Sequence, residues 1–234
     1  MIVSVRIRRH LLSRVCSLVA LVGFFTVGAR ADMYNPSWQW RIVENNSGLF
    51  STYASQLSVN VTPFGSMVDF TFSNEGPNPC SITGIYFEDG TLLGLASVIA
   101  LDPIADDPSR DGIVFGQPAH PSNMPGWSTL NPKFYSSSAF TVGSNGAADG
   151  VSPGESLVLR YALQPGQTFN DVITALNLGF TNPDPTAHTS LRIGLHVQDI
   201  GQDSDSMILT PVPGAWILGM LGLGVAGVKL RKYA

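Results

Sequence analysis

The chain contains little cysteine and little positive charge. Of its 234 residues only Cys16 and Cys80 are cysteine, and only 13 are lysine or arginine against 17 aspartate and glutamate. A fold held by several disulfides is excluded, as is a cysteine-rich metal site. Five basic residues lie in residues 1–31 and three follow Val228, so the stretch between them has a net charge of 5 minus 17, or −12. We therefore expect no nucleic-acid partner, because phosphate backbones are bound through clustered lysine and arginine.

The chain also lacks the local motifs of the common catalytic and metal sites. The histidines beyond residue 31 are His120, His188 and His196, and none has the spacing of HExxH or of a paired zinc site. No Gly-x-Ser-x-Gly elbow marks a serine as a nucleophile. We expect no enzymatic activity, no metal and no cofactor. The alternation of residues 191–197 places His196 on the face opposite the apolar side chains, where we expect it to meet solvent.

Two groups of acidic residues raise the question of calcium binding. Neither matches the twelve-residue calcium loop with its terminal glutamate, so we expect solvated loop carboxylates. The first group is Asp102, Asp106, Asp107 and Asp111, and the second is Asp199, Asp203 and Asp205.

Residues 1–31 have the three parts of a secretory signal peptide. Four arginines precede the apolar run 15–28, and Ala29 and Ala31 fit the small-x-small pattern before a cleavage site. We expect cleavage before Asp32 by signal peptidase after delivery to the secretion machinery. Residues 1–31 are thus predicted to be a signal helix that is removed from the mature protein.

Residues 210–234 form a second targeting segment. An apolar run, 215–228, would rise about 21 Å as a helix, which is short of the roughly 30 Å hydrocarbon core and makes it a marginal membrane span. The flanking charges can reach the headgroups if the bilayer thins locally. The segment consists of a motif, Pro211, Val212, Pro213, Gly214 and Ala215, then the apolar run, then a basic tail with Lys229, Arg231 and Lys232.

The intervening residues 32–209 read as a single all-β domain. Short apolar or alternating runs separated by Gly-Pro, Pro-Gly, Asp-Gly and Asn-Gly steps predict an antiparallel β-sandwich of jelly-roll type. One short helix is expected at 168–176, where apolar residues recur at helical spacing. Loops are expected at 102–126, 136–138 and 142–154. The predicted strands are 57–61, 67–72, 82–87, 92–100, 157–163 and 191–197.

Cys80 and three tryptophans each allow two interpretations. Because Cys16 leaves with the signal peptide, Cys80 has no internal partner and is either a small buried residue or an intermolecular thiol. Trp38, Trp40 and Trp127 either pack in the core or stack on sugar rings.

The tail and parts of the domain resemble a known family. The sequence TPVPGA-WILGMLGLGVAGV-KLRKYA resembles the PEP-CTERM sorting signal of Gram-negative and related bacteria. Residues 69–94, 151–173 and 191–208 resemble a domain common in proteins that carry this signal. The resemblance implies a membrane partner, exosortase, a cysteine transpeptidase thought to cut near the Pro-Glu-Pro motif.

The resemblance extends to named positions of the motif. Pro211 and Pro213 match the two prolines, Val212 stands where the family has glutamate, and Gly214-Ala215 occurs in a variant class, Pro-x-Pro-Gly-Ala. The implied route is export, a cytoplasmic-membrane intermediate, and then the envelope, surface or extracellular polysaccharide. We expect a non-catalytic surface or matrix protein. The alternative is a carbohydrate-binding or adhesive sandwich anchored permanently by a C-terminal transmembrane helix.

Overall fold

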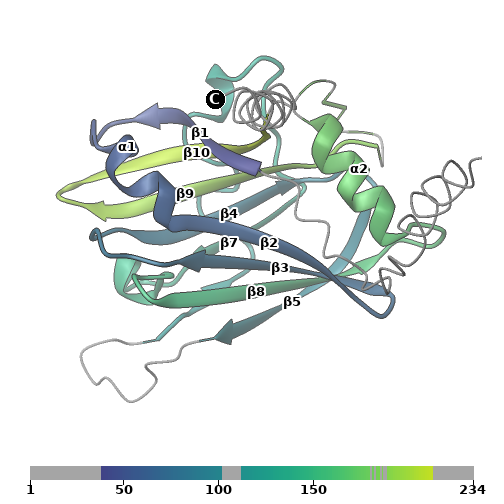
Figure 1. Cartoon of the computed structure of the whole chain (residues 1–234), viewed down its shortest axis with the longest axis horizontal. Helices are drawn as coiled ribbons and strands as arrows, with labels where there is room; N and C mark the ends of the chain where they lie inside the picture. Colours follow the sequence, from purple (N-terminus) through teal and green to yellow (C-terminus); the bar gives the residue numbers. More distant parts are fainter. Residues whose placement is uncertain are drawn as a thin grey trace, which may run out of the picture. The chain divides into compact units, whose positions relative to one another are not determined.

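The computed structural model describes residues 38–101, 112–179, 181, 183–184, 186 and 189–212. In this part of the chain the strands form two antiparallel sheets (Figure 1), ordered β1-β10-β9-β4-β7-β6 and β2-β3-β8-β5. The expected all-β, sandwich-like fold is confirmed. The strands are β1 (Trp38–Asn45), β2 (Leu57–Phe64), β3 (Met67–Asn74), β4 (Ser81–Glu88), β5 (Leu93–Leu101), β6 (Phe115–Gly116), β7 (Ser138–Val142), β8 (Glu155–Leu163), β9 (Arg192–Ile200) and β10 (Asp203–Pro211).

The helix expected at 168–176 is confirmed as α2 (Phe169–Gly179). At its start the backbone N–H and the hydroxyl of Thr168 donate to the Asp171 carboxylate at 2.7 and 2.6 Å, and the backbone N–H of Asp171 donates to the Thr168 hydroxyl at 3.4 Å. Val172, Ile173 and Leu176 are buried on one face, as the helical spacing requires. The other helices are single turns: α1 (Phe50–Tyr53), η1 (Ala54–Gln56), η2 (Trp127–Thr129) and η3 (Gly146–Asp149).

The main core lies between the two sheets and is centred on aromatic side chains. Phe87 of β4 contacts Phe70 of β3 and Tyr161 of β8, with ring centroids 5.1 and 4.8 Å apart. These edge and tilted contacts suit the charge distribution of aromatic rings. Trp40 of β1 donates its indole N–H to the carbonyl of Leu57 at 2.9 Å and so links the six-stranded sheet to the first strand of the four-stranded sheet.

A second, smaller core covers the outer face of the six-stranded sheet. Residues 117–137, the covering loop, place three buried side chains against Tyr86 and Ile208. Those three are Ala119, Met124 and Phe134. The outer face of this sheet is therefore buried over much of its length, although sequence alternation alone predicts a solvated face.

A buried ion pair holds the covering loop to the sheet. Arg192 is 5% exposed and pairs with Glu88, and its guanidinium also donates to the carbonyls of Pro132 and Lys133 at 3.0 and 2.6 Å. Glu88 accepts a further hydrogen bond from the backbone N–H of Tyr135 at 2.7 Å. The two side chains thus neutralise each other's charge and also form hydrogen bonds with backbone groups of the covering loop.

All six predicted strands are present, while three strands were not predicted. They are β1, β7 and β10; the two-residue β6 was not expected either. The loop expected at 102–126 is wrong at Phe115–Gly116, which form β6, and the loops expected at 136–138 and 142–154 are wrong at Ser138 and Val142, the two ends of β7.

The two targeting segments fall largely beyond the described part of the chain. The signal peptide, 1–31, and residues 213–234 of the tail lie outside it. Among the described residues, no helix is long and apolar enough to span a bilayer.

Candidate functional site

The described domain ends within the expected sorting motif. Pro211 is the last residue of β10 and pairs with Trp38, the first residue of β1. The Thr210 hydroxyl donates to the carbonyl of Gln39 at 3.1 Å, and Val212 is half-buried. The remaining predicted site residues lie outside the described residues: Pro213, Gly214, Ala215, Lys229, Arg231, Lys232, Ala29 and Ala31.

The pairing of β1 with β10 brings the two ends of the domain side by side. We call this end, marked by Trp38 and Pro211, the terminal pole. The opposite end of the same strands carries the β9–β10 hairpin turn at 200–203, and we call it the hairpin pole. At about 3.3 Å per residue, the nine residues of β10 separate the two poles by roughly 26 Å.

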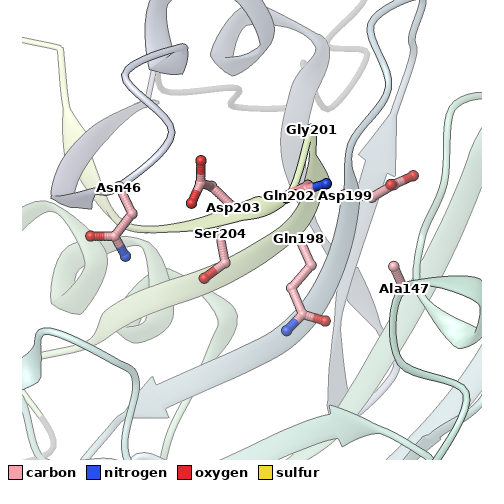
Figure 2. A pocket seen from close by; sticks show the side chains of 8 residues that line it. All are labelled: Asn46, Ala147, Gln198, Asp199, Gly201, Gln202, Asp203 and Ser204. Carbon is pink, nitrogen blue, oxygen red and sulfur yellow. The ribbon is translucent and has the colours of Figure 1, made fainter.

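A groove opens at the hairpin pole (Figure 2). One hollow of about 460 Å³ lies beside the turn, and a second of about 570 Å³ adjoins it, with Ala147 and Asp199 shared by both. We call the two together the hairpin groove. The first hollow is lined by Asn46, Ala147, Gln198, Asp199, Gly201, Gln202, Asp203 and Ser204. The second is lined by Pro77, Pro79, Ala147, Ala148, Ser152, Pro153 and Asp199.

Local backbone geometry places the polar groups of the groove. Ile200 pairs with Asp203 across a two-residue turn, and Gly201 has φ +69°. Asp199 also has a left-handed φ, of 61°, which aspartate adopts more readily than most residues. In Figure 2 the side chains of Asn46, Ser204 and Gln198 lie in a row below the turn, while Asp199 extends to the other side, where Ala147 also lies.

The groove has unused hydrogen-bonding groups and negative charge. Asn46, Gln198 and Gln202 make no side-chain hydrogen bond to any other described residue. Asp199 and Asp203 add two carboxylates, and among the described residues that line the two hollows there is no lysine, arginine or histidine. Such a surface can accept and donate hydrogen bonds but offers no cation to an anionic ligand.

Asp205, expected to be a solvated loop acid, is fully buried in β10, so that expectation was wrong. Its carboxylate accepts hydrogen bonds from the Ser47 backbone and hydroxyl at 2.9 and 2.5 Å and from the Tyr53 hydroxyl at 2.7 Å. Burial by itself raises the pKa of Asp205, but these hydrogen bonds outweigh it and the pKa is lowered. The network fixes the turn after β1, from which Asn46 enters the groove.

His196 of β9 lies on the expected face, opposite the apolar side chains, but it is half-buried there and less exposed to solvent than expected. Its Nδ1 lies 3.2 Å from the hydroxyl of Ser206, its partner across the β9–β10 pair. Burial lowers the pKa of His196, against a smaller opposing effect of Asp205. His196 and Ser206 do not form a hydrolase triad with Asp205. Asp205 and Ser206 are adjacent in β10 and therefore face opposite sides of the sheet, and the Asp205 carboxylate binds Ser47 and Tyr53 instead.

The other histidines are not brought to this site. His120 is exposed in the covering loop, and His188 lies outside the described residues. In the part of the chain that the structure describes, no three His, Cys, Asp or Glu side chains are grouped to hold a metal ion. The first acidic group, at 102–111, also lies outside that part.

The tryptophans do not form an aromatic platform. Trp40 is buried, and Trp38 is half-buried with its indole N–H 3.4 Å from the Asn177 side chain. Trp127 is half-buried against Tyr135, with the two rings inclined by 53°. Core and loop packing therefore accounts for most of their surface.

Cys80 is a buried core residue, and the interpretation as an intermolecular thiol is wrong for the folded domain. The side chain is 1% exposed, and its sulfur accepts hydrogen bonds from Gln56 at 3.1 Å and Asn74 at 3.7 Å.

A scan against protein-family models, a search of curated proteins and a search of solved structures found no match to this chain.

Sequence reasoning did not identify the hairpin groove, although it noted three of the nearby acids. The only local signal was the Gly201-Gln202 step between two alternating runs, which is typical of a hairpin turn. Asn46 and Ala147 reach the groove from distant parts of the chain, so their participation depends on the fold.

Proposed function

We propose that this chain is an exported, non-catalytic surface or extracellular-matrix protein, delivered by its N-terminal signal and sorted through a PEP-CTERM-type tail by an exosortase-like membrane transpeptidase. The observation that carries the proposal is the pairing of Trp38 with Pro211. It places the positions nearest the two targeting segments at one pole. Because both segments join the domain at the terminal pole, the domain would be attached to the membrane at that pole alone.

The short distance between the domain and the apolar run supports processing at the membrane surface. Only residues 212–215 separate the last strand from Trp216. Four residues span at most about 14 Å when extended. An enzyme embedded in the membrane would therefore meet the motif directly beside the folded domain.

A second candidate function leaves the tail intact. Val212 replaces the family's glutamate, and both Pro211 and Val212 are half-buried at the end of the domain. These features favour a carbohydrate-binding or adhesive module anchored permanently by residues 215–228. The two candidates differ in the fate of the C-terminal peptide.

We also propose that the sandwich belongs to the jelly-roll type. Consecutive strands β3, β4 and β5 alternate between the two sheets, and β8 returns between β3 and β5. In the other sheet β7 lies between β4 and β6. This interleaving of early and late strands supports a jelly-roll order, to which β1, β2, β9 and β10 add flanking strands.

The sorting proposal is tested by mass spectrometry of the protein extracted from the cell surface. We expect the mature protein to begin at Asp32 and to lack residues 216–234, because cleavage near Pro211–Ala215 separates them. Replacing residues 212–215 by serine should retain the full-length chain in the inner membrane, whereas Val212→Glu, which restores the family residue, should be processed at least as well as the wild type. An intact C-terminal peptide in surface-extracted protein would contradict sorting and favour the permanent anchor.

A further inference from the structure

We propose that the hairpin groove binds a neutral polysaccharide chain through direct hydrogen bonds from its amide and carboxylate side chains. The inference rests on the proposed function in one respect: the hairpin pole faces outward only if the domain is held by its terminal pole. The inference adds a ligand class and a binding site to the proposed function, neither of which follows from the sorting tail.

The chemistry of the groove matches sugar hydroxyl groups. Each hydroxyl both donates and accepts a hydrogen bond, and a side-chain amide does the same through its NH₂ and carbonyl. Asn46, Gln198 and Gln202 supply three such amides with no described protein partner, and Ser204 adds a hydroxyl. Figure 2 shows Asn46, Ser204 and Gln198 in a row, so that one chain could contact them in succession.

The charge of the groove selects against anionic polymers. Asp199 and Asp203 are its charged lining residues, and they accept hydrogen bonds from hydroxyls but repel uronate, sulfate or phosphate groups. The surrounding domain reinforces the selection, since residues 32–228 have a net charge of 5 minus 17, or −12. Neutral sugars avoid this repulsion.

The shape of the groove suits a chain better than a single small molecule. The two hollows, of about 460 and 570 Å³, are neighbours, since Ala147 and Asp199 line both of them. Each volume is within the usual range of small-ligand sites. Pro77, Pro79 and Pro153 line the second hollow and offer rigid apolar surface to the C–H faces of sugar rings.

The groove lies at the end of the domain farthest from the tail. It lies roughly 26 Å along β10 from Pro211, at the far end of the strand pair that joins the two ends of the domain. A domain held at the terminal pole would present the groove to its surroundings.

The test measures retention of the purified full-length chain, in detergent, on an array of immobilised neutral and anionic polysaccharides. We expect retention on at least one neutral glucan or mannan and none on alginate or heparin. The double variant Asn46→Ala/Gln198→Ala should lose at least about tenfold in affinity, since it removes two of the side-chain amides that hydrogen-bond the sugar. Gln39→Ala, which removes an exposed amide near the terminal pole, is the matched control and should bind like the wild type.

Thermal unfolding of each variant shows whether it is folded, and the tail-peptide assay shows whether it is sorted. A folded, normally sorted double variant that binds as tightly as the wild type would overturn the groove assignment while leaving the proposed function in place. Retention on anionic polymers alone, or retention that a chelator abolishes, would also overturn it, because either result requires a cation that the groove does not supply.

Discussion

At the residue scale, Cys80 shows how burial and neighbouring side chains can make a thiol unreactive. It lies just before β4, 1% exposed, in contact with the side chains of Gln56 and Asn74. Burial raises the pKa of its thiol to about 11, while the hydrogen bonds from Asn74 and Gln56 act in the opposite direction. Because the thiolate is the reactive form, both access and ionisation are suppressed.

We therefore predict that Cys80 does not react with thiol reagents in the folded protein. In the Cys16→Ser chain at neutral pH, labelling should be more than about 100-fold slower in native buffer than in denaturant, since the raised pKa alone accounts for that factor. The measurement is mass spectrometry over a time course. Equal labelling rates in the two conditions would show that the pocket of Cys80 is open.

At the scale of elements, two arginines illustrate how different ion pairs can be in one fold. Arg160 of β8 pairs with Asp69 of β3 at 2.6 and 2.7 Å, but its side chain remains 22% exposed. Arg192 pairs with Glu88 at 5% and 1% exposure and binds two carbonyls of the covering loop. The first joins neighbouring strands, whereas the second fastens a loop to a sheet.

We predict that Arg192→Met destabilises the protein far more than Arg160→Met. Loss of Arg192 leaves Glu88 charged and buried, which costs about 3–5 kcal/mol, while the solvent-screened pair of Arg160 contributes much less. Chemical denaturation of the full chain measures both free energies of unfolding. Adding Glu88→Gln to Arg192→Met should recover part of the loss, and similar losses for the two single variants would contradict the assignment.

The elements that sequence reasoning missed have physical causes in common. The predicted strands are apolar or regularly alternating, whereas β7 begins at the last of three consecutive serines and β10 begins Asp-Ser-Asp-Ser, where a buried network holds Asp205. The face of His196 and Arg192 was assigned correctly, but its burial could not be predicted, because the covering loop that packs on this side of the sheet is distant in the sequence. The groove combines residues 46, 147 and 198–204, which only the tertiary fold brings together.

At the scale of the whole molecule, the two sheets pack against each other through the main core, to which Trp40 adds a hydrogen bond. Trp40 is 8% exposed, packs in the main core, and donates its indole N–H to Leu57 at 2.9 Å. Trp38, two residues earlier on the same face, is only half-buried, and its hydrogen bond is longer at 3.4 Å. The two tryptophans therefore differ in how much they contribute to the stability of the sandwich.

We predict that Trp40→Ala lowers the free energy of unfolding by about 3–5 kcal/mol, the usual range for a large aromatic residue removed from a core. Trp38→Ala should cost clearly less. Circular dichroism and tryptophan fluorescence followed through one denaturation series test this, and coincident transitions would show that the two sheets unfold together. A loss for Trp38→Ala equal to that for Trp40→Ala would contradict the proposed role of Trp40.

The pairing of β1 with β10 has a consequence for the timing of folding. β1 is the first described strand to be synthesised, and in the described sheets β10, the last, is its partner. A chain that emerges N-terminus first must therefore carry an unpaired β1 until nearly all of the domain has appeared. The sandwich is completed only when the chain reaches Pro211, so the final folding step coincides with the appearance of the tail.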